Sequence, residues 1–394
     1  MNQKSKIAIA GGGILGISVG ISLLSQNPKL NVVVLEKESG LGFHASGRNS
    51  GVLHAGFYYS PDSLKAKFCK EGNARLLHYI KKYEVPYKNV GKVVIAKSDS
   101  ESKILEKLYQ RGITNGVTLD ILDKSELVKI EPLAKTSRDF LWSPTTGISD
   151  PQLMLKALAR EFESLGGRIE FNSTITFNEV LQVNGVAFHC DHLINAAGVH
   201  SLELAKQMGF GSKYRVMPFL GTYRKVNHDK LPLQRLVYPV PHPVNPFLGV
   251  HFTLTIDGQV KIGPTAIPIL GKEQYTVSSG FTIKDFLVFT ENVYSIARGT
   301  KHKLTSIALS EYPNLLERTL VHRASLLVPD ANRTKGWEKK QPGIRAQLLN
   351  IESGELVQDF IYEGDLKSTH ILNAVSPGWT AALPFADFIT SKIA

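Results

Sequence analysis

Three glycines and one glutamate have the spacing of a dinucleotide-binding turn. Gly11, Gly13 and Gly16 form a G-x-G-x-x-G pattern, and Glu36 follows Gly16 by twenty residues. Gly11 permits a tight turn, Gly13 lets the backbone approach a pyrophosphate, and Gly16 lets a helix pack closely on a strand. The Glu36 carboxylate suits ribose hydroxyls and would repel a 2′-phosphate. The pattern therefore predicts a bound dinucleotide.

The elements around these residues strengthen the prediction. Residues 7–10 and 32–35 are apolar runs typical of buried parallel strands, and an apolar helix is expected between them. The N-terminus of that helix presents amide groups and a partial positive charge to phosphates. A signal peptide or a membrane helix is disfavoured, because the uncharged run 7–25 starts with many glycines and no cleavage signal follows. The expected contacts extend to Ile14, Leu15 and Lys37.

A loop of some twenty residues, from Gly40 to Ser60, follows the second strand and is too rich in glycine for a helix or a strand. Loops of this length in compact proteins are usually functional. This one would extend along the dinucleotide, with small residues and backbone donors near it. His54 and His44 are its titratable imidazoles. The expected cofactor contacts are Ser46, Arg48, Asn49, Ser50 and Gly51.

Two later segments have small residues after a short buried strand. The first is Asn195-Ala196-Ala197-Gly198, where Ala197 and Gly198 would let a second backbone segment approach the cofactor. A plain turn from strand to helix is the alternative for this segment. The second follows the short strand 370–373 and precedes a terminal helix, 381–393. Its expected contacts are Pro377, Gly378, Trp379 and Thr380.

The rest of the chain alternates between helical and extended patterns. An antiparallel sheet is expected from 216–266, a stretch rich in prolines and aromatic residues. Asn184-Gly185 predicts a β-hairpin over 180–190. Helices are expected at 63–82, 100–114, 150–166 and 281–310, and further strands at 93–96, 168–175, 323–328 and 343–349.

These patterns predict an α/β protein (α+β overall) with a Rossmann-like FAD-binding domain and a second, mostly antiparallel β domain for the substrate. The flavin follows from the long loop and from the three separated cofactor segments, which suggest a deeply enclosed dinucleotide. The expected cofactor domain comprises 1–84, 145–212 and 340–394. The expected substrate domain comprises 85–144 and 213–339.

Composition limits the class of partner. The net charge is +11, but the basic residues are scattered, which disfavours a nucleic-acid groove. Attraction of an anionic substrate or of an anionic membrane surface remains open, as does a merely solvated surface. Cys69 and Cys190 are the two cysteines, which argues against a disulfide framework and a zinc site. We expect no metal, and a cytoplasmic protein that is at most peripheral on the inner face of the cell membrane.

Beyond these patterns, the whole chain resembles flavin oxidoreductases of the D-amino acid oxidase and glycerol-3-phosphate dehydrogenase superfamily. Within it, four segments resemble L-2-hydroxyglutarate oxidase/dehydrogenase: HASGRNSGVLHAGFYY (44–59), YPVPHPVNPFLGVHFT (238–253), PGIRAQLL (342–349) and HILNAVSPGWTAALP (370–384). The resemblance implies FAD and oxidation of L-2-hydroxyglutarate to 2-oxoglutarate. Trp379 is a departure, because many members have small residues after Ser-Pro.

Oxidation of a hydroxy acid by a flavin needs a proton acceptor and cations for the carboxylates. His54 and His251 are the candidate bases, and we favour His54 because it lies in the cofactor loop. Arg345 is the candidate carboxylate ligand, because its guanidinium can bind a carboxylate through two hydrogen bonds. The electron acceptor is expected to be oxygen or a quinone. The alternatives are an amine oxidase of the same fold and a flavin-binding module without turnover. Weaker candidates for hydroxyl contacts are Tyr59 and Tyr238.

Overall fold

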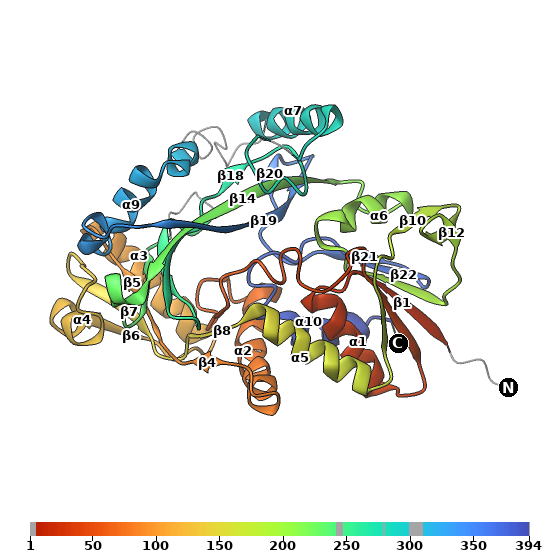
Figure 1. Cartoon of the computed structure of the whole chain (residues 1–394), viewed down its shortest axis with the longest axis horizontal. Coiled ribbons are helices and arrows are strands. Elements are labelled where there is room, and N and C mark those ends of the chain that lie inside the picture. Colours follow the sequence, from red (N-terminus) through yellow and green to blue (C-terminus); the bar gives the residue numbers. More distant parts are fainter. Residues whose placement is uncertain (1–4, 242–246, 279, 299–309, 394) are drawn as a thin grey trace.

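The structure is a computed structural model that describes residues 5–241, 247–278, 280–298 and 310–393. Two large sheets dominate it, one on each side of the view in Figure 1. Both sheets combine strands that are far apart in the sequence. The cofactor loop and the C-terminal segment lie between them (Figure 1).

The six-stranded sheet is centred on β1 (Lys6–Ala10), which pairs in parallel with β2 (Asn31–Leu35) and β13 (His192–Asn195). Helix α1 (Ile14–Gln26) connects β1 to β2, so the predicted strand–helix–strand unit is confirmed. The strand order is β21-β22-β13-β1-β2-β9. The other members are β9 (Arg168–Glu170), β22 (Ser368–Ile371) and the antiparallel edge strand β21 (Tyr362–Gly364).

Side chains of β1 alternate between two buried faces, as the pleat of a strand requires. Ile7 and Ile9 pack with α1, α5 (Pro151–Ser164) and α10 (Ala382–Thr390), and α2 (Leu64–Lys82) packs on α10. Ala8 and Ala10 pack on the opposite face. The elements of that face are β10 (Ile175–Asn178), β11 (Val180–Val183), β12 (Val186–Ala187) and α6 (Ser201–Gln207).

The ten-stranded sheet is built on a long antiparallel ladder between β14 (Tyr214–Asn227) and β19 (Glu338–Asn350). Its order is β20-β19-β14-β17-β16-β15-β5-β7-β6, and β18 pairs with β14. Strands β15 and β5 pair in parallel. The remaining strands are β5 (Lys92–Ile95), β6 (Asp120–Asp123), β7 (Asp139–Ser143), β15 (Leu236–Pro239), β16 (His251–Leu254), β17 (Gln259–Gly263), β18 (Ile267–Pro268) and β20 (Glu355–Leu356).

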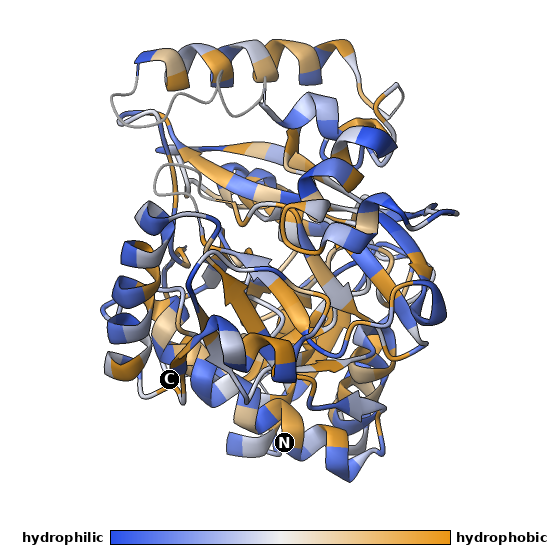
Figure 2. Ribbon diagram, turned by 90° about the vertical axis from the view of Figure 1, so that its left-hand side faces the viewer, coloured by the Kyte–Doolittle hydropathy of each residue, from blue (hydrophilic) through white to orange (hydrophobic). Residues whose placement is uncertain are grey.

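In the described part of the chain, four further helices contact the ten-stranded sheet, and three short strands form a separate small sheet. Helix α7 lies across β14 at the top of Figures 1 and 2, and Figure 2 shows apolar residues along its length. The small sheet has the order β3-β8-β4. The bounds are α3 (Asp99–Thr114), α4 (Lys124–Ile130), α7 (Ile283–Arg298), α9 (Glu317–Ser325), β3 (Val52–Leu53), β4 (Tyr87–Lys88) and β8 (Gly147–Ser149).

The predicted fold class is confirmed, and several local predictions are too. Asp150 caps α5 by accepting a hydrogen bond from the Leu153 amide, and Pro151 occupies the first helical position. The hairpin forms at Asn184-Gly185, although its second strand ends at Ala187. The strand predicted at 168–175 ends at Glu170.

One predicted element has the wrong type of secondary structure. Residues 323–328 were predicted to form a strand, but α9 runs through Ser325. The buried side chains Leu320, Ala324 and Val328 recur every four residues, which is the spacing of a helix face. The short apolar run at the end of α9 resembled a strand, because an apolar run of this length occurs both in strands and in buried helices. The predicted helix 281–310 is present as α7, and its continuation through 299–309 lies outside the described residues.

Strand β19 bears on the domain boundaries. It pairs along β14, whereas the predicted division assigns residues from 340 onward to the cofactor domain. That division stays a prediction, and this ladder argues for moving its last boundary to about residue 350.

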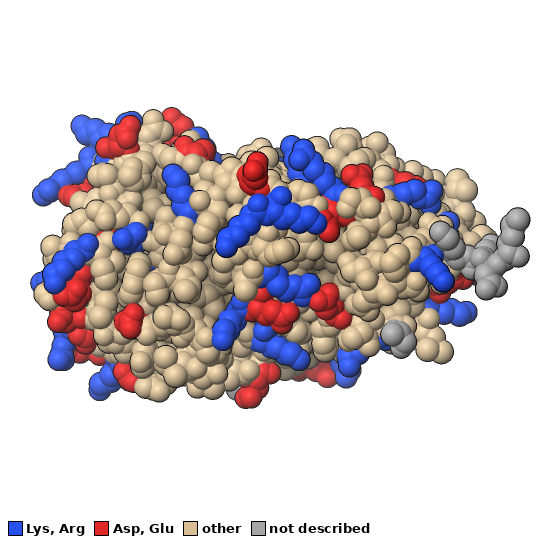
Figure 3. All heavy atoms as spheres, turned by 90° about the horizontal axis from the view of Figure 1, so that it is seen from below, with Lys and Arg blue, Asp and Glu red and all other residues tan. Residues whose placement is uncertain are grey.

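Within the described residues, no helix is long and apolar enough to cross a bilayer. On the face shown in Figure 3, lysine and arginine side chains are interspersed with aspartate and glutamate.

Candidate active site

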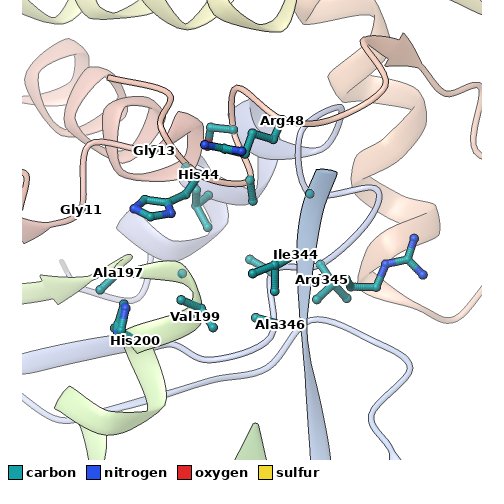
Figure 4. A pocket seen from close by; sticks show the side chains of 18 of the residues that line it. Gly11, Gly13, His44, Arg48, Ala197, Val199, His200, Ile344, Arg345 and Ala346 are labelled. Carbon is teal, nitrogen blue, oxygen red and sulfur yellow. The ribbon is translucent and has the colours of Figure 1, made fainter. Parts of the chain in front are cut away.

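A cavity of about 660 Å³ lies between the two large sheets. Its volume is in the range of small-molecule and cofactor sites. The ends of β1, β2 and β13 line one part of it, and residues of β14 and β19 line another. Figure 4 shows Gly11 and Ala197 on one side of this pocket and Arg345 on the other. The cavity therefore joins the predicted dinucleotide end to the predicted substrate end.

The glycine-rich turn forms the wall at the dinucleotide end. Gly11 has φ +101°, and a Cβ there would lie 2.7 Å from the carbonyl oxygen of Ala196. A Cβ on Gly13 would lie 2.9 Å from Ser46 Oγ, in space that lines the cavity. A Cβ on Gly16 would lie 2.0 Å from the Gly11 carbonyl oxygen. Gly11 therefore permits the close approach of the Ala196–Ala197 backbone, Gly13 keeps space in the cavity open, and Gly16 serves the packing of α1.

Glu36 lies at the end of β2 with its carboxylate held by backbone amides. Its Oε2 accepts a hydrogen bond from Gly12 N–H at 2.7 Å, and its Oε1 accepts one from Glu38 N–H at 2.9 Å. Ser46 Oγ accepts a hydrogen bond from Ile14 N–H at 2.9 Å, in the first turn of α1. The carboxylate is thus fixed on the cavity wall with acceptor capacity left for ribose hydroxyls.

The C-terminal segment holds the cofactor loop in place. Thr380 Oγ1 accepts a hydrogen bond from His54 N–H at 3.2 Å and donates one to the Val52 carbonyl oxygen at 3.3 Å. Asn49 accepts a hydrogen bond from Gly51 N–H at 2.9 Å, which shapes the turn before β3. The described chain therefore brings three separated segments to one cavity, as expected.

Most of the predicted cofactor contacts line this cavity. Gly16 and Gly51 do not: Gly51 has φ +75°, and a Cβ there would lie 2.3 Å from the Ser149 carbonyl oxygen. The lining includes Gly11, Gly13, Ile14, Leu15, Glu36, Lys37, Ser46, Arg48, Asn49, Ser50, Ala197, Gly198, Pro377, Gly378, Trp379 and Thr380. These residues fit the expected FAD, because an open glycine cradle, a helix N-terminus and a fixed carboxylate occupy one continuous wall.

A segment of the second domain, Lys272–Tyr275, crosses to the dinucleotide end. Glu273 pairs with Lys37 at 2.6 Å and with His200 at 2.7 Å. Tyr275 hydrogen-bonds with His44 at 2.7 Å and lies under the Arg48 guanidinium, 4.1 Å from the ring centroid. We call this segment the strap. Hydrogen bonding to His200, followed by that to Lys37, lowers the pKa of Glu273 to about 2.

The strap should slow loss of the cofactor, because its residues line the same cavity as the glycine-rich turn. Glu273→Gln removes the charge shared by two half-exposed ion pairs, each worth about 0–1 kcal/mol. We expect FAD to dissociate roughly two- to ten-fold faster, measured by the rise of free flavin fluorescence after dilution. Glu291→Gln on α7, which removes an ion pair with Arg215 of β14, is the control. Equal rates for both variants would remove the strap from cofactor retention.

One group of potential metal ligands meets in the described part of the chain. Ligand atoms of Glu38, His44 and Glu273 lie within 4.8 Å of one another. Lys37 Nζ lies 2.7 Å from Glu38 and 2.6 Å from Glu273, so an ammonium already holds the position that a cation would take. The cluster is therefore part of the strap contact.

Arg345 and His54 line the other end of the cavity. The Arg345 guanidinium lies 4.9 Å from the Phe247 ring centroid, and burial lowers its pKa. Tyr223 and Tyr59 act on it in the described structure, as do the basic groups of His54 and Lys65, and none of these is a carboxylate. His54 Nδ1 is buried without a hydrogen-bond partner among the described residues. Burial, followed by the charge of Lys92, lowers the pKa of His54 well below 6.5, which keeps the imidazole neutral.

The other two predicted catalytic residues lie off the cavity wall. His251 is buried, and its Nδ1 hydrogen-bonds with the Gly249 carbonyl oxygen at 2.8 Å. Its ring stacks on Tyr238 with 3.9 Å between the centroids. Burial lowers the pKa of His251 to about 3 and raises that of Tyr238. The structure therefore places His54, and not His251, on the wall of the cavity. Tyr59 also lies off this wall and hydrogen-bonds with Ser376.

Sequence reasoning missed several polar residues near the site. Lys92, Lys261 and Lys65 are buried lysines, and burial lowers their pKa values to about 7, 7 and 8. A lysine beginning the apolar run 92–95 was a signal for the first of them. The strap and its partner His200 had no local signal, because the contact joins segments that are distant in the sequence.

Comparisons with known proteins identify the chain's relatives. The sequence profile of the FAD dependent oxidoreductase family DAO matches residues 6–353. The mitochondrial L-2-hydroxyglutarate dehydrogenase of Caenorhabditis elegans is 34% identical over 408 residues, covering 99% of this chain and 93% of the relative. The L-2-hydroxyglutarate dehydrogenase of Escherichia coli K12 is 34% identical over 399 residues, covering 98% and 92%.

Solved structures show the same fold. FAD-bound L-alpha-glycerophosphate oxidase from Mycoplasma pneumoniae superposes with a TM-score of 0.75 at 24% identity, covering 99% of this chain and 95% of that one. Glycine oxidase from Geobacillus kaustophilus superposes with a TM-score of 0.71 at 17% identity, covering 99% of this chain and 95% of that one.

Proposed function

Because the chain belongs to the FAD-dependent oxidoreductase family, uses FAD, and is similar over its whole length to L-2-hydroxyglutarate dehydrogenases, we propose that it oxidises L-2-hydroxyglutarate to 2-oxoglutarate. FAD held by the glycine-rich turn and the Glu36 carboxylate would supply the two-electron oxidant for the C2–H bond of the substrate, with oxygen or a quinone as the final electron acceptor. The chain's own residues bind the acid, orient it and accept the hydroxyl proton.

The observation that carries the proposal is Arg345. Its guanidinium lies at the cavity with no carboxylate among the described groups that act on it. Arg345 is half-buried, and a cation that loses part of its hydration without an anionic partner is destabilised, so the site is complete only with an anion. A substrate carboxylate fits, since the guanidinium can form two parallel hydrogen bonds to it. This favours an acid over a neutral alcohol as the substrate.

His54 is the proposed acceptor of the hydroxyl proton. It lies on the cavity wall, its Nδ1 lacks a hydrogen bond within the described structure, and its lowered pKa keeps a ring nitrogen free to accept. Thr380 fixes its backbone through the hydrogen bond to His54 N–H. The Lys272–Tyr275 strap and the glycine-rich turn hold the dinucleotide at the far end.

An amine substrate is the rival reading, because the same fold serves glycine oxidase. The two readings are separated by mixing the protein, without oxygen, with each member of a panel of L- and D-2-hydroxy acids and amino acids. The measurement is which of these compounds bleaches the flavin absorbance. We expect L-2-hydroxyglutarate to bleach the flavin fastest and amino acids to leave it oxidised. Bleaching by an amino acid alone would replace the proposal with an amine oxidase. No bleaching by any acid would favour a flavin-binding module.

We also propose that the protein is cytoplasmic and binds peripherally to the inner face of the cell membrane. A quinone acceptor resides in that membrane. Exposed apolar side chains on α7 support this: Ile283, Leu287 and Tyr294 share one face and are 80%, 57% and 60% exposed. Lys284 and Arg298 flank that face, and the net charge is +11.

Sedimentation with anionic phospholipid vesicles tests the membrane contact. We expect the combined change Leu287→Ser and Tyr294→Ser to weaken co-sedimentation at least several-fold. Leu366→Ser, at an exposed apolar residue of a distant loop, should leave it unchanged. Equal sedimentation of both variants would contradict the role of α7.

A further inference from the structure

Lys92 is a buried lysine enclosed by aromatic rings. It begins β5, has no exposed surface, and lies off the cavity wall. Its Nζ lies 4.5 Å from the ring centroid of Tyr238, 5.2 Å from that of Tyr58 and 5.3 Å from that of Phe57. It has no hydrogen-bond partner among the described residues. Rings attract an ammonium only modestly, so the cage does not fully offset the loss of hydration.

The cage around the ammonium is built from residues that neighbour both candidate bases. Tyr238, one wall of the cage, stacks on His251 with 3.9 Å between the centroids. Phe57 and Tyr58, two further walls, follow His54 in the cofactor loop by three and four residues. The walls of the cage therefore connect Lys92 to the loop that carries His54 and to the ring of His251, while Lys92 itself lies off the cavity wall that His54 lines.

The titratable side chains that act on His54 are all basic groups. His54 is acted on by Lys92 from β5, His251 from β16 and Arg345 from β19. Lys92 is acted on by Cys69 from α2, whose thiol has its pKa raised to about 12 by burial and is therefore neutral. Among the described groups that act on either residue, none is a carboxylate. No acidic group is thus present to stabilise a protonated His54.

We propose that Lys92 is a positioning residue that acts through His54, its caged ammonium keeping the imidazole unprotonated and ready to accept the substrate's hydroxyl proton. The proposal rests on the proposed function, in which His54 is that acceptor. Burial lowers the pKa of Lys92 to about 7, so the ammonium is charged below about pH 7, where an ordinary histidine would start to take up a proton. The same repulsion favours release of the proton after each turnover.

The test is the pH profile of kcat/KM for L-2-hydroxyglutarate in the FAD-loaded protein. Lys92→Met keeps the apolar contacts and removes the charge. We expect the acid limb of its profile to move to higher pH by about one unit. At a pH below that limb, kcat/KM should then be about ten-fold lower than in the wild type. Lys92→Arg keeps the charge and should retain the wild-type limb. Lys88→Met, at an exposed lysine of β4, is the matched control and should superimpose on the wild type.

Thermal unfolding separates this role from a structural one. Lys92→Met removes an uncompensated buried charge, so its melting temperature should equal or exceed that of the wild type. An unshifted acid limb would overturn the proposal, and so would a limb that moves equally in Lys92→Arg. If the wild type fails to oxidise the acid, the proposed function fails instead. If His54→Gln is fully active, the acid is still the substrate, but His54 is not the acceptor and the role of Lys92 is overturned with it.

Discussion

Replacing Arg345 with methionine is expected to lower kcat/KM for L-2-hydroxyglutarate by about 30- to 4,000-fold. The estimate corresponds to about 2–5 kcal/mol for truncating one partner of a buried, hydrogen-bonded charge pair. Arg345 lines the cavity and has no carboxylate among the described groups that act on it, so the partner must be the ligand. Arg345→Lys keeps the charge and loses the planar fork, so an intermediate loss is expected.

The control for this prediction lies on the same ladder. Arg215 of β14 pairs with Glu291 on α7 and does not line the cavity. Arg215→Met should leave the kinetics within about two-fold of wild type, as for surface pairs in general. Unchanged kinetics in Arg345→Met would assign that arginine to the packing of β19 against Phe247.

His54→Gln is the second large effect. It removes the proposed proton acceptor and should lower the rate constant of flavin reduction at least about a hundred-fold, the usual range for a general base. Single-turnover mixing without oxygen measures that step directly. Because the folded pKa of His54 lies well below 6.5, the wild-type rate should hold as the pH falls through 6.5 and be lost only further into acid.

His251→Gln is the comparison that discriminates between the two imidazoles. His251 lies off the cavity wall and hydrogen-bonds with the Gly249 carbonyl oxygen, so its loss should reduce the rate less than that of His54. A larger loss for His251 would reverse the assignment. Near-wild-type rates for both would place the proton acceptor elsewhere.

The dinucleotide end could be predicted from the sequence because its determinants are local. Gly11, Gly13 and Glu36 belong to one strand–helix–strand unit, in which glycine geometry and strand length set the position of each group. The same holds for the Asp150 cap of α5. Short-range rules suffice wherever one unit positions the side chain.

The reacting end depends on contacts between distant segments. Lys92 begins β5, its cage comes from Tyr238 of β15 and from the cofactor loop, and the strap crosses from the second domain to His200. Strand pairing across a ten-stranded sheet brings these together, and no local pattern encodes it. The mistaken strand at 323–328 has a related cause, since a short apolar run does not distinguish a strand from the end of a helix.

Anaerobic mixing of the FAD-loaded protein with L-2-hydroxyglutarate is the most direct test of the proposed function. The account predicts complete bleaching of the flavin absorbance and one 2-oxoglutarate formed per flavin, while D-2-hydroxyglutarate at the same concentration leaves the flavin oxidised. A flavin that stays oxidised with the L-enantiomer, yet bleaches with an amino acid or with glycerol 3-phosphate, would contradict it.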